Sequence, residues 1–265
     1  MKRSPRVFFS FRSPFSWMAV ERMQRAIPDV HKLLQFIPYW EPDQRTREAL
    51  QKREAEIRYA AMSKAKHLYI LQDTKRLAGE LGLRIVWPVD IAPWWEVSHL
   101  GWLKARRLGQ GTAFYKVVTE ARWQRGENIS DPNVVRKLAE SVGLDGDIIL
   151  QAIDDPDIRA EGVDSLVDAY QDDIFGVPYF RIGGHRLWGF DRVDRFIALL
   201  NCTLPQSIGE SSTSSVGNAG ASLLETSVPT NNRPRSPVSA SLDGIPSEVE
   251  SQTGSYDNDT AGGCG

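Results

Sequence analysis

The segment Val7–Met23 constrains the fold of this chain more than any other. Its first part, Val7–Phe11, is an apolar run typical of a buried strand, and it turns at once into a helical pattern. Ser13 and Pro14 stand at the junction. Serine can cap the free N–H groups of a helix and proline suits the first helical position, so a helix is expected to begin here.

Two interpretations of Ser13 follow from these residues. In the first, Ser13 is a helix cap and nothing more, since serine caps are common. In the second, its hydroxyl lies at the positive end of a helix, just beyond the carboxyl end of a strand. Open α/β sheets bind ligands at that place, and anions or thiolates are stabilised there. One serine can do both.

The order of the elements predicts the fold class. A second apolar run, Leu33–Trp40, reads as a strand parallel to the first, and Pro38 indicates an edge or the exit from the sheet. Helical patterns then fill about residues 44–172. Two apolar runs separated by Gly183 and Gly184 predict a β-hairpin, and a last helix is expected from Asp191. This β-α-β, β-β-α order is the α/β thioredoxin arrangement with a large helical insertion between its halves.

The helical patterns of the insertion are bounded by local signals. The long one ends at Gly82, and another begins after Asp131 as a cap and ends at Gly143. The expected helices span 62–81, 94–108, 111–125, 132–142, 145–153 and 157–171, after a charged segment over 45–58.

Composition divides the chain of 265 residues into two parts. From about Leu204 it is rich in Ser, Thr, Gly, Asn and Pro, and Tyr256 is its one aromatic residue. Such a segment buries too little apolar surface to offset its ordering entropy. We therefore expect a folded domain over residues 1–203 and a disordered tail over 204–265.

Charge and hydropathy exclude several classes of partner. The net charge of −2 gives no support to nucleic-acid binding. No apolar stretch approaches the roughly 20 residues that span a membrane. The amino terminus is basic and then apolar but shows no cleavage signature, so a cytoplasmic protein is expected.

The cysteines and histidines offer no redox or metal motif. The two cysteines, Cys202 and Cys264, do not form a C-x-x-C pair, so dithiol chemistry has no motif to act through. The four histidines, at positions 31, 67, 99 and 185, lack ligand spacing and are interpreted as surface or packing residues. No metal site is predicted.

Four motifs, in order and at sensible spacing, carry a family resemblance. They lie at Ser13–Trp17, Lys66–Asp73, Trp123–Asp131 with Gly143–Asp145 behind it, and Phe175–Pro178 followed by Trp188–Arg192. Together they resemble the DsbA-like thioredoxin-fold family that contains 2-hydroxychromene-2-carboxylate isomerases and kappa-class glutathione transferases. The resemblance covers about residues 7–200.

The resemblance implies a glutathione site with Ser13 as its catalytic residue. In the family, the matching serine replaces the first cysteine of C-x-x-C and stabilises the glutathione thiolate, a role that a helix amino terminus supports. The resemblance also implies that Pro178 is a cis-proline, against an ordinary trans proline that starts a strand. The backbone of Val177 would then pair with the peptide part of glutathione, like an added strand.

Three further residues are expected to bind the cofactor. By resemblance, Asp191 holds the γ-glutamyl amine, although its local pattern favours a helix cap. Lys66 by resemblance meets a ligand carboxylate, against the alternative of a solvated helical lysine. Phe190 stands just before Asp191 in place of a polar residue and is expected in the same site.

Several departures from the family pattern predict a changed pocket. Arg12 replaces an acidic residue before the serine motif, and it either strengthens anion binding or points to solvent. Residues 39–43 replace a loop that carries a ligand-contacting asparagine. Tyr179 follows the proline in place of a small threonine. With Phe190, these changes predict a more aromatic and narrower pocket.

Three functions compete. The favoured one is a glutathione-dependent isomerase or transferase whose thiolate attacks an aromatic or unsaturated organic acid. The second is a catalytically silent thioredoxin-fold binding protein that uses the same groove. The third, a thiol-disulfide oxidoreductase, is disfavoured by the lack of C-x-x-C. A small-molecule substrate is expected, and the resemblance implies a homodimer, for which the sequence shows no decisive interface signal.

Overall fold

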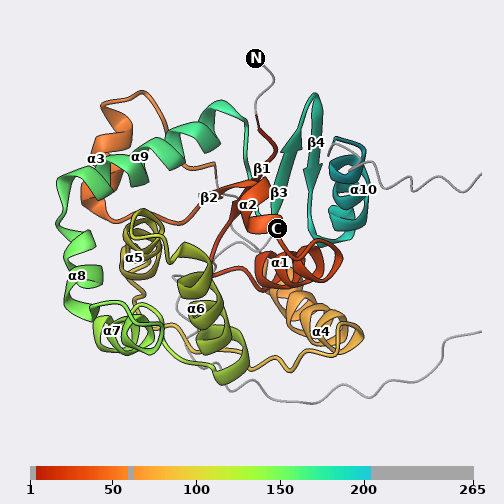
Figure 1. The fold of residues 1–265 in the computed structure, drawn as a ribbon, viewed down its shortest axis with the longest axis horizontal. Helices are drawn as coiled ribbons and strands as arrows, with labels where there is room; N and C mark the ends of the chain where they lie inside the picture. Colours follow the sequence, from red (N-terminus) through yellow and green to blue (C-terminus); the bar gives the residue numbers. More distant parts are fainter. Residues whose placement is uncertain (1–3, 59–62, 204–265) are drawn as a thin grey trace, which may run out of the picture. The chain divides into compact units, whose positions relative to one another are not determined.

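A mixed sheet forms the centre of the computed structural model, which describes residues 4–58 and 63–203 (Figure 1). In this part of the chain the sheet has four strands in the order β2-β1-β3-β4. β1 runs parallel to β2 and antiparallel to β3, and β3 is antiparallel to β4. The strands are β1 (Arg6–Phe9), β2 (Gln35–Pro38), β3 (Tyr179–Ile182) and β4 (His185–Trp188). The thioredoxin arrangement expected from the sequence is confirmed, and the tail over 204–265 lies outside the described residues.

The first strand is shorter than its apolar run. β1 ends at Phe9 instead of Phe11, because the backbone of Ser10 and Phe11 leaves the sheet to make other hydrogen bonds. The Ser10 carbonyl accepts from the Ser13 N–H at 3.1 Å, and the Phe11 N–H donates to the His99 ring at 3.2 Å. This turn brings the chain directly to the amino terminus of α1 (Pro14–Ala26).

The second strand also differs at its start. A short helix, α2 (Val30–Leu33), precedes it, so β2 covers only the central four residues of the expected run. β2 is an edge strand, as Pro38 indicated, because proline lacks the N–H that a central strand needs.

The insertion between β2 and β3 is helical, as expected. Asp43 caps its first helix, since its carboxylate accepts from the Thr46 N–H at 2.8 Å. The insertion helices α5 to α9 gather beyond the β2 edge of the sheet, whereas α4 lies below α1 in Figure 1. The described elements are α3 (Gln44–Gln51), α4 (Lys64–Glu80), α5 (Glu96–Arg107), α6 (Gly111–Arg125), α7 (Pro132–Ser141), α8 (Gly146–Leu150), the 3₁₀ turn η1 (Gln151–Ile153) and α9 (Pro156–Gln171).

The carboxyl-terminal half returns to the sheet. β3 and β4 form the expected hairpin, and Gly183 takes the positive φ of +55° that its tight turn requires. The last helix begins later than expected, because Phe190–Arg192 form a 3₁₀ turn, η2, before α10 (Val193–Thr203). Asp191 therefore lies inside a turn and is not the cap of α10.

The hydrophobic core extends from the sheet into the helical insertion. Phe8, Phe9 and Phe180 are fully buried in one continuous apolar cluster that also contains residues of α5, α6 and α9. A smaller cluster joins Trp17 and Met18 of α1 to Ala78 of α4 and Trp123 of α6. α1 is thus fixed on both sides, which holds its amino terminus in place against the sheet.

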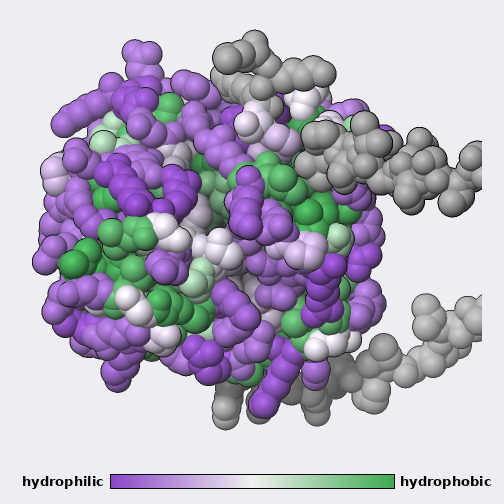
Figure 2. Space-filling view, viewed as in Figure 1, coloured by the Kyte–Doolittle hydropathy of each residue, from purple (hydrophilic) through white to green (hydrophobic). Residues whose placement is uncertain are grey.

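The surface is mainly polar. Figure 2 shows a largely hydrophilic face with smaller apolar areas between the charged side chains. None of the helices over 4–58 and 63–203 has the length and apolar character that crossing a bilayer requires.

Candidate functional site

Ser13 lies at the amino terminus of α1, and both predicted uses of its hydroxyl remain open. Its Oγ accepts from the Ser16 N–H at 3.1 Å, so Ser13 is the helix cap that the sequence predicts. The same hydroxyl donates to the Val177 carbonyl at 3.4 Å, a long hydrogen bond. Only 1% of Ser13 is exposed, so its hydroxyl is almost completely shielded from solvent.

Val177 and Pro178 are brought directly beside Ser13. The bond between them is cis, as the resemblance implies. Both residues are buried, and the Pro178 carbonyl accepts from the Gly189 N–H at 3.0 Å. Segments about 164 residues apart in sequence therefore meet at one hydroxyl.

A second serine occupies the other position of the dithiol motif. Ser16 stands three residues after Ser13, and its Oγ accepts from the Ser10 N–H at 3.3 Å. Cys202, exposed on α10, is the one cysteine among the described residues. Within the described residues, no cysteine of the chain lies at this helix terminus.

His99 of α5 fixes the turn that precedes Ser13. Burial lowers the pKa of His99 to about 3, so the imidazole is neutral. Its Nδ1–H donates to the Trp95 carbonyl at 2.7 Å, which leaves Nε2 as an acceptor for the Phe11 N–H. The Ser10 hydroxyl lies 3.4 Å from the same Nε2. His99 is thus a packing and positioning residue, as the lack of ligand spacing indicated.

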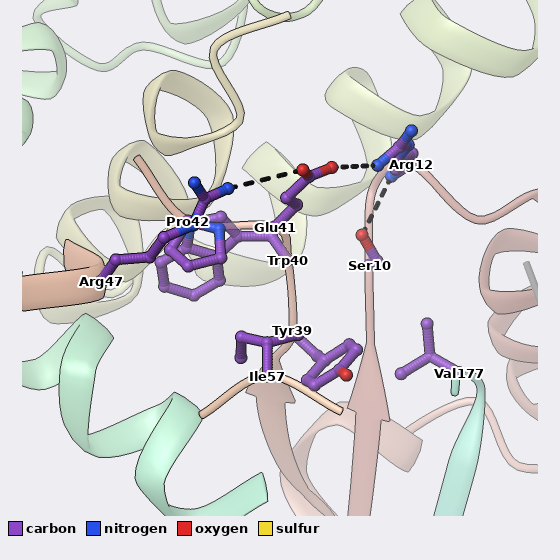
Figure 3. Close-up of a pocket in the computed structure, with 9 residues that line it drawn as sticks. All are labelled: Ser10, Arg12, Tyr39, Trp40, Glu41, Pro42, Arg47, Ile57 and Val177. Carbon is purple, nitrogen blue, oxygen red and sulfur yellow. Dashed lines mark hydrogen bonds and ion pairs between the residues drawn. The ribbon is translucent and has the colours of Figure 1, made fainter. Parts of the chain in front are cut away.

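Arg12 borders a pocket that adjoins Ser13 through Ser10 and Val177 (Figure 3). We call the cavity of about 170 Å³ lined by the nine residues labelled in Figure 3 the Arg12 pocket. The Arg12 guanidinium pairs with Glu41 at 3.0 Å and lies 5.2 Å from the Trp95 ring centroid. Its side chain is only 12% exposed, so the alternative in which Arg12 points to solvent is wrong.

The loop after β2 forms the other wall of this pocket. Glu41 also reaches Arg47 of α3 at 3.5 Å, so its carboxylate bridges two arginines. The Tyr39 hydroxyl donates to the Arg58 carbonyl at 3.0 Å, which holds its ring against the pocket. Where the family pattern has a ligand-contacting asparagine, this chain therefore presents an aromatic wall and an ion-paired carboxylate.

The remaining predicted site residues lie on elements that pack against α1. Asp191, in η2, is exposed and pairs with Arg192 at 2.5 Å, and Phe190 is half-buried against the cluster that contains Trp17. Lys66 is exposed near the start of α4, where its backbone N–H donates to Ser63 Oγ at 3.2 Å. The structure joins Ser13 directly to Val177, the residue before Pro178. Phe190 and Asp191 lie on η2 and Lys66 lies on α4, elements that pack against α1, but the structure brings none of these three side chains into direct contact with Ser13.

The sequence interpretation assigned no role to Ser16, and it did not foresee the contact of His99 with Phe11 or the bridge that Glu41 makes. Ser16 could have been found from its spacing to Ser13, which is that of C-x-x-C. His99 and Glu41 act through contacts 88 and 29 residues away along the chain, for which the sequence holds no local signal. Residues 4–58 and 63–203 contain no cluster of acids, histidines and cysteines that could hold a metal ion.

The chain belongs to the family of DsbA-like thioredoxin domains, whose family model matches residues 6–201. Among curated proteins it is similar to the 2-hydroxychromene-2-carboxylate isomerase of Sphingobium xenophagum. The two are 27% identical over 194 residues, which are 71% of this chain and 92% of the relative.

Solved structures support the same fold. A 2-hydroxychromene-2-carboxylate isomerase structure aligns with a TM-score of 0.58 and 22% identity, over 75% of this chain and 94% of its own. The cytosolic disulfide reductase DsbM of Pseudomonas aeruginosa, solved with GSH, aligns with a TM-score of 0.52 and 15% identity, over 76% and 98%.

Proposed function

We propose that this protein is a glutathione-dependent isomerase or transferase that acts on an aromatic or unsaturated organic acid. The observation that carries the proposal is the position of the Ser13 hydroxyl, at the amino terminus of α1 and beside the cis-proline segment. The similarity to an isomerase of organic acids supports the reaction class.

Ser13 would stabilise the thiolate of bound glutathione. Its proton is directed at the Val177 carbonyl over a long 3.4 Å contact, and a thiolate placed nearby would offer a charged acceptor instead. Hydrogen bonds to ionised groups are roughly twice as strong as neutral ones, so this exchange is favourable. The positive end of α1, a helix of 13 residues, adds to the effect.

The rest of glutathione would lie along the segments that surround Ser13. We propose that the backbone of Val177 and Pro178 pairs with the peptide, that Asp191 binds the γ-glutamyl ammonium, and that Phe190 packs against the ligand. Lys66, at the start of α4, would meet a glutathione carboxylate. The GSH-bound neighbour of the same fold makes a glutathione site a reasonable use of this scaffold.

The proposed reaction begins when the thiolate forms a carbon–sulfur bond with an electrophilic carbon conjugated to an acceptor group of the substrate. The electron pair released onto that acceptor is then protonated or returns. If the carbon–sulfur bond breaks again after rotation within the adduct, the outcome is isomerisation and the thiolate is regenerated. If the bond persists, the outcome is conjugation, as in a transferase.

A catalytically silent binding protein is the second candidate. It is favoured by the near-complete burial of Ser13 and by the ion pairs of Glu41 at the mouth of the Arg12 pocket, which leave a narrow site. A thiol-disulfide oxidoreductase is disfavoured, because serines occupy both positions of the dithiol motif.

Calorimetric titration of glutathione into the full chain tests the proposed site. Wild type should bind saturably, and Asp191→Asn should weaken binding by about tenfold or more, because it removes the partner of the ligand ammonium. Asp194→Asn is the matched control, since it removes a nearby exposed carboxylate that pairs with Arg22.

Equal weakening by both variants would show a general charge effect and contradict the role of Asp191. No heat from wild type at millimolar glutathione would reject the glutathione site itself.

A further inference from the structure

The Arg12 pocket combines a charged rim with an apolar floor (Figure 3). Arg12, Glu41 and Arg47 form the rim, whereas Tyr39 and Ile57 lie on the opposite side of the opening. This division matches a ligand that has an apolar body and one anionic end.

Glu41 occupies the place that such an anion would take. One of its carboxylate oxygens pairs with Arg12 at 3.0 Å and the other with Arg47 at 3.5 Å. A carboxylate site between two guanidinium groups is therefore already formed, and a side chain of this same protein fills it.

The two partners of this ion pair are held very differently. Arg12 is 12% exposed and packed over the Trp95 ring, whereas the Glu41 side chain is 54% exposed. Because the Glu41 side chain is exposed, water can hydrate its carboxylate once another carboxylate replaces it on Arg12, and the nearly buried guanidinium then stays paired throughout the exchange. The cation is fixed while its present anion is replaceable.

The volume of the pocket suits one aromatic ring. Its size, about 170 Å³, can be compared with a cavity of about 150 Å³ that accepts benzene. Tyr39, Ile57 and Val177 supply apolar contacts, and Val177 also touches the Ser13 hydroxyl. A ring bound there would lie next to the proposed thiolate.

We propose that Glu41 is a displaceable gate. Its carboxylate fills a subsite that binds the carboxylate of the substrate, and it leaves when the substrate binds. The aromatic ring of the substrate enters between Tyr39, Ile57 and Val177, and its carboxylate replaces that of Glu41 on Arg12 and Arg47. This inference rests on the proposed function, in which the substrate is an organic acid. The inference names Arg12 and Arg47 as the residues that select an acid. It also names Glu41 as the competing group that limits the affinity for that acid.

Calorimetric titration with benzoate, in the absence of glutathione, tests the gate on the full chain. Glu41→Gln should lower the Kd for benzoate by about tenfold or more, because the competing carboxylate is gone while its shape is kept. Asp154→Asn is the matched control, since it removes one negative charge from an exposed pair with Arg45. Arg12→Gln should abolish binding, and neutral benzamide should gain nothing from Glu41→Gln.

Glu41 is exposed, so its variant should fold and can decide the question by itself. Equal Kd values of wild type and Glu41→Gln for benzoate, or an equal gain in Asp154→Asn, would overturn the gate. No benzoate binding by either protein at tens of millimolar would do the same.

A second titration identifies the source of the carboxylate. If glutathione displaces benzoate from Glu41→Gln, a glutathione carboxylate uses the subsite, and the assignment to the substrate is wrong. If glutathione and benzoate bind at the same time, the assignment to the substrate is supported. Failure of benzoate binding in a protein that binds glutathione rejects the gate alone. Failure of glutathione binding rejects the proposed function, whatever benzoate does.

Discussion

The hydroxyl of Ser13 performs two hydrogen-bonding roles at a single atom. It accepts from the Ser16 N–H and donates its one proton to the Val177 carbonyl. As an acceptor, the hydroxyl stabilises the helix whether or not a ligand is present. As a donor, it makes only the long hydrogen bond to the Val177 carbonyl. Capping and thiolate binding therefore use different parts of the same hydroxyl and do not exclude each other.

Glu96 gives the folded protein a pH dependence near neutrality. It is 1% exposed and accepts from the Asp43 N–H at 2.5 Å. Burial raises the pKa of Glu96 to about 7 from an ordinary 4.5. The folded state therefore binds this proton more tightly than the unfolded state. The stabilisation of the folded state by this tighter proton binding is fully present below pH 4.5, and it is lost as the pH rises through about 7.

We expect Glu96→Gln to remove this loss of stability. Between about pH 4.5 and pH 7.5, its free energy of unfolding should rise relative to wild type by up to about 3 kcal/mol. Urea unfolding at a series of pH values measures it, with the exposed Glu48→Gln as control. Burial lowers the pKa values of His31 and His99, so these residues make the free energy of unfolding rise with pH. Because they do so equally in wild type and variants, the difference between Glu96→Gln and wild type reports on Glu96. A pH-independent difference would show that Glu96 does not titrate as described.

At the scale of elements, α9 packs so closely that a glycine is needed. A Cβ added at Gly162 would lie 2.8 Å from a Leu100 methyl and 3.2 Å from the Trp40 ring. Leu100 and Trp40 are buried, so they cannot simply move into solvent. Trp40 also lines the Arg12 pocket, which links this helix contact to the site.

We expect Gly162→Ala to destabilise the protein by about 1–2 kcal/mol. Overpacking costs roughly 1–3 kcal/mol and is partly offset by a helix-propensity gain of up to about 1 kcal/mol. Gly79→Ala in α4 is the control, because no atom lies within 4 Å of its added Cβ and only the propensity gain applies. Denaturant unfolding compares the two variants. Equal stabilisation by both would contradict the close contact at Gly162.

Elements with strong local signals were predictable from sequence. Ser13 and Pro14 marked the start of α1, and Gly183 with Gly184 marked the hairpin. The 3₁₀ turn η2 was missed, because Asp191 has the local pattern of a helix cap and only the packing of η2 on α1 shows otherwise. Local propensity sets where elements occur, while tertiary contacts decide their last residues.

At the scale of the whole molecule, the fold assembles the site from segments far apart in sequence. The order of strands and helices was sufficient to predict the thioredoxin arrangement, and the family match confirms it. The pair of Arg12 with Glu41 and the contact of His99 with Phe11 could not be predicted. They depend on how the insertion folds back over the end of β1.

The pKa of glutathione's thiol when bound tests the central claim most directly. Thiolate absorbance is followed against pH for the complex, minus the protein alone, so that the protein's own cysteines cancel. Ser141→Ala is the matched control, because the Ser141 hydroxyl donates to the Leu138 carbonyl, as that of Ser13 does to Val177, and Ser141 has no part in the proposed glutathione site.

Wild type and Ser141→Ala should hold the thiol at the same lowered pKa. Ser13→Ala should raise it by about 1–2 units, the equivalent of one hydrogen bond to a charged group. A bound-thiol pKa that is the same in Ser13→Ala and wild type would contradict the account.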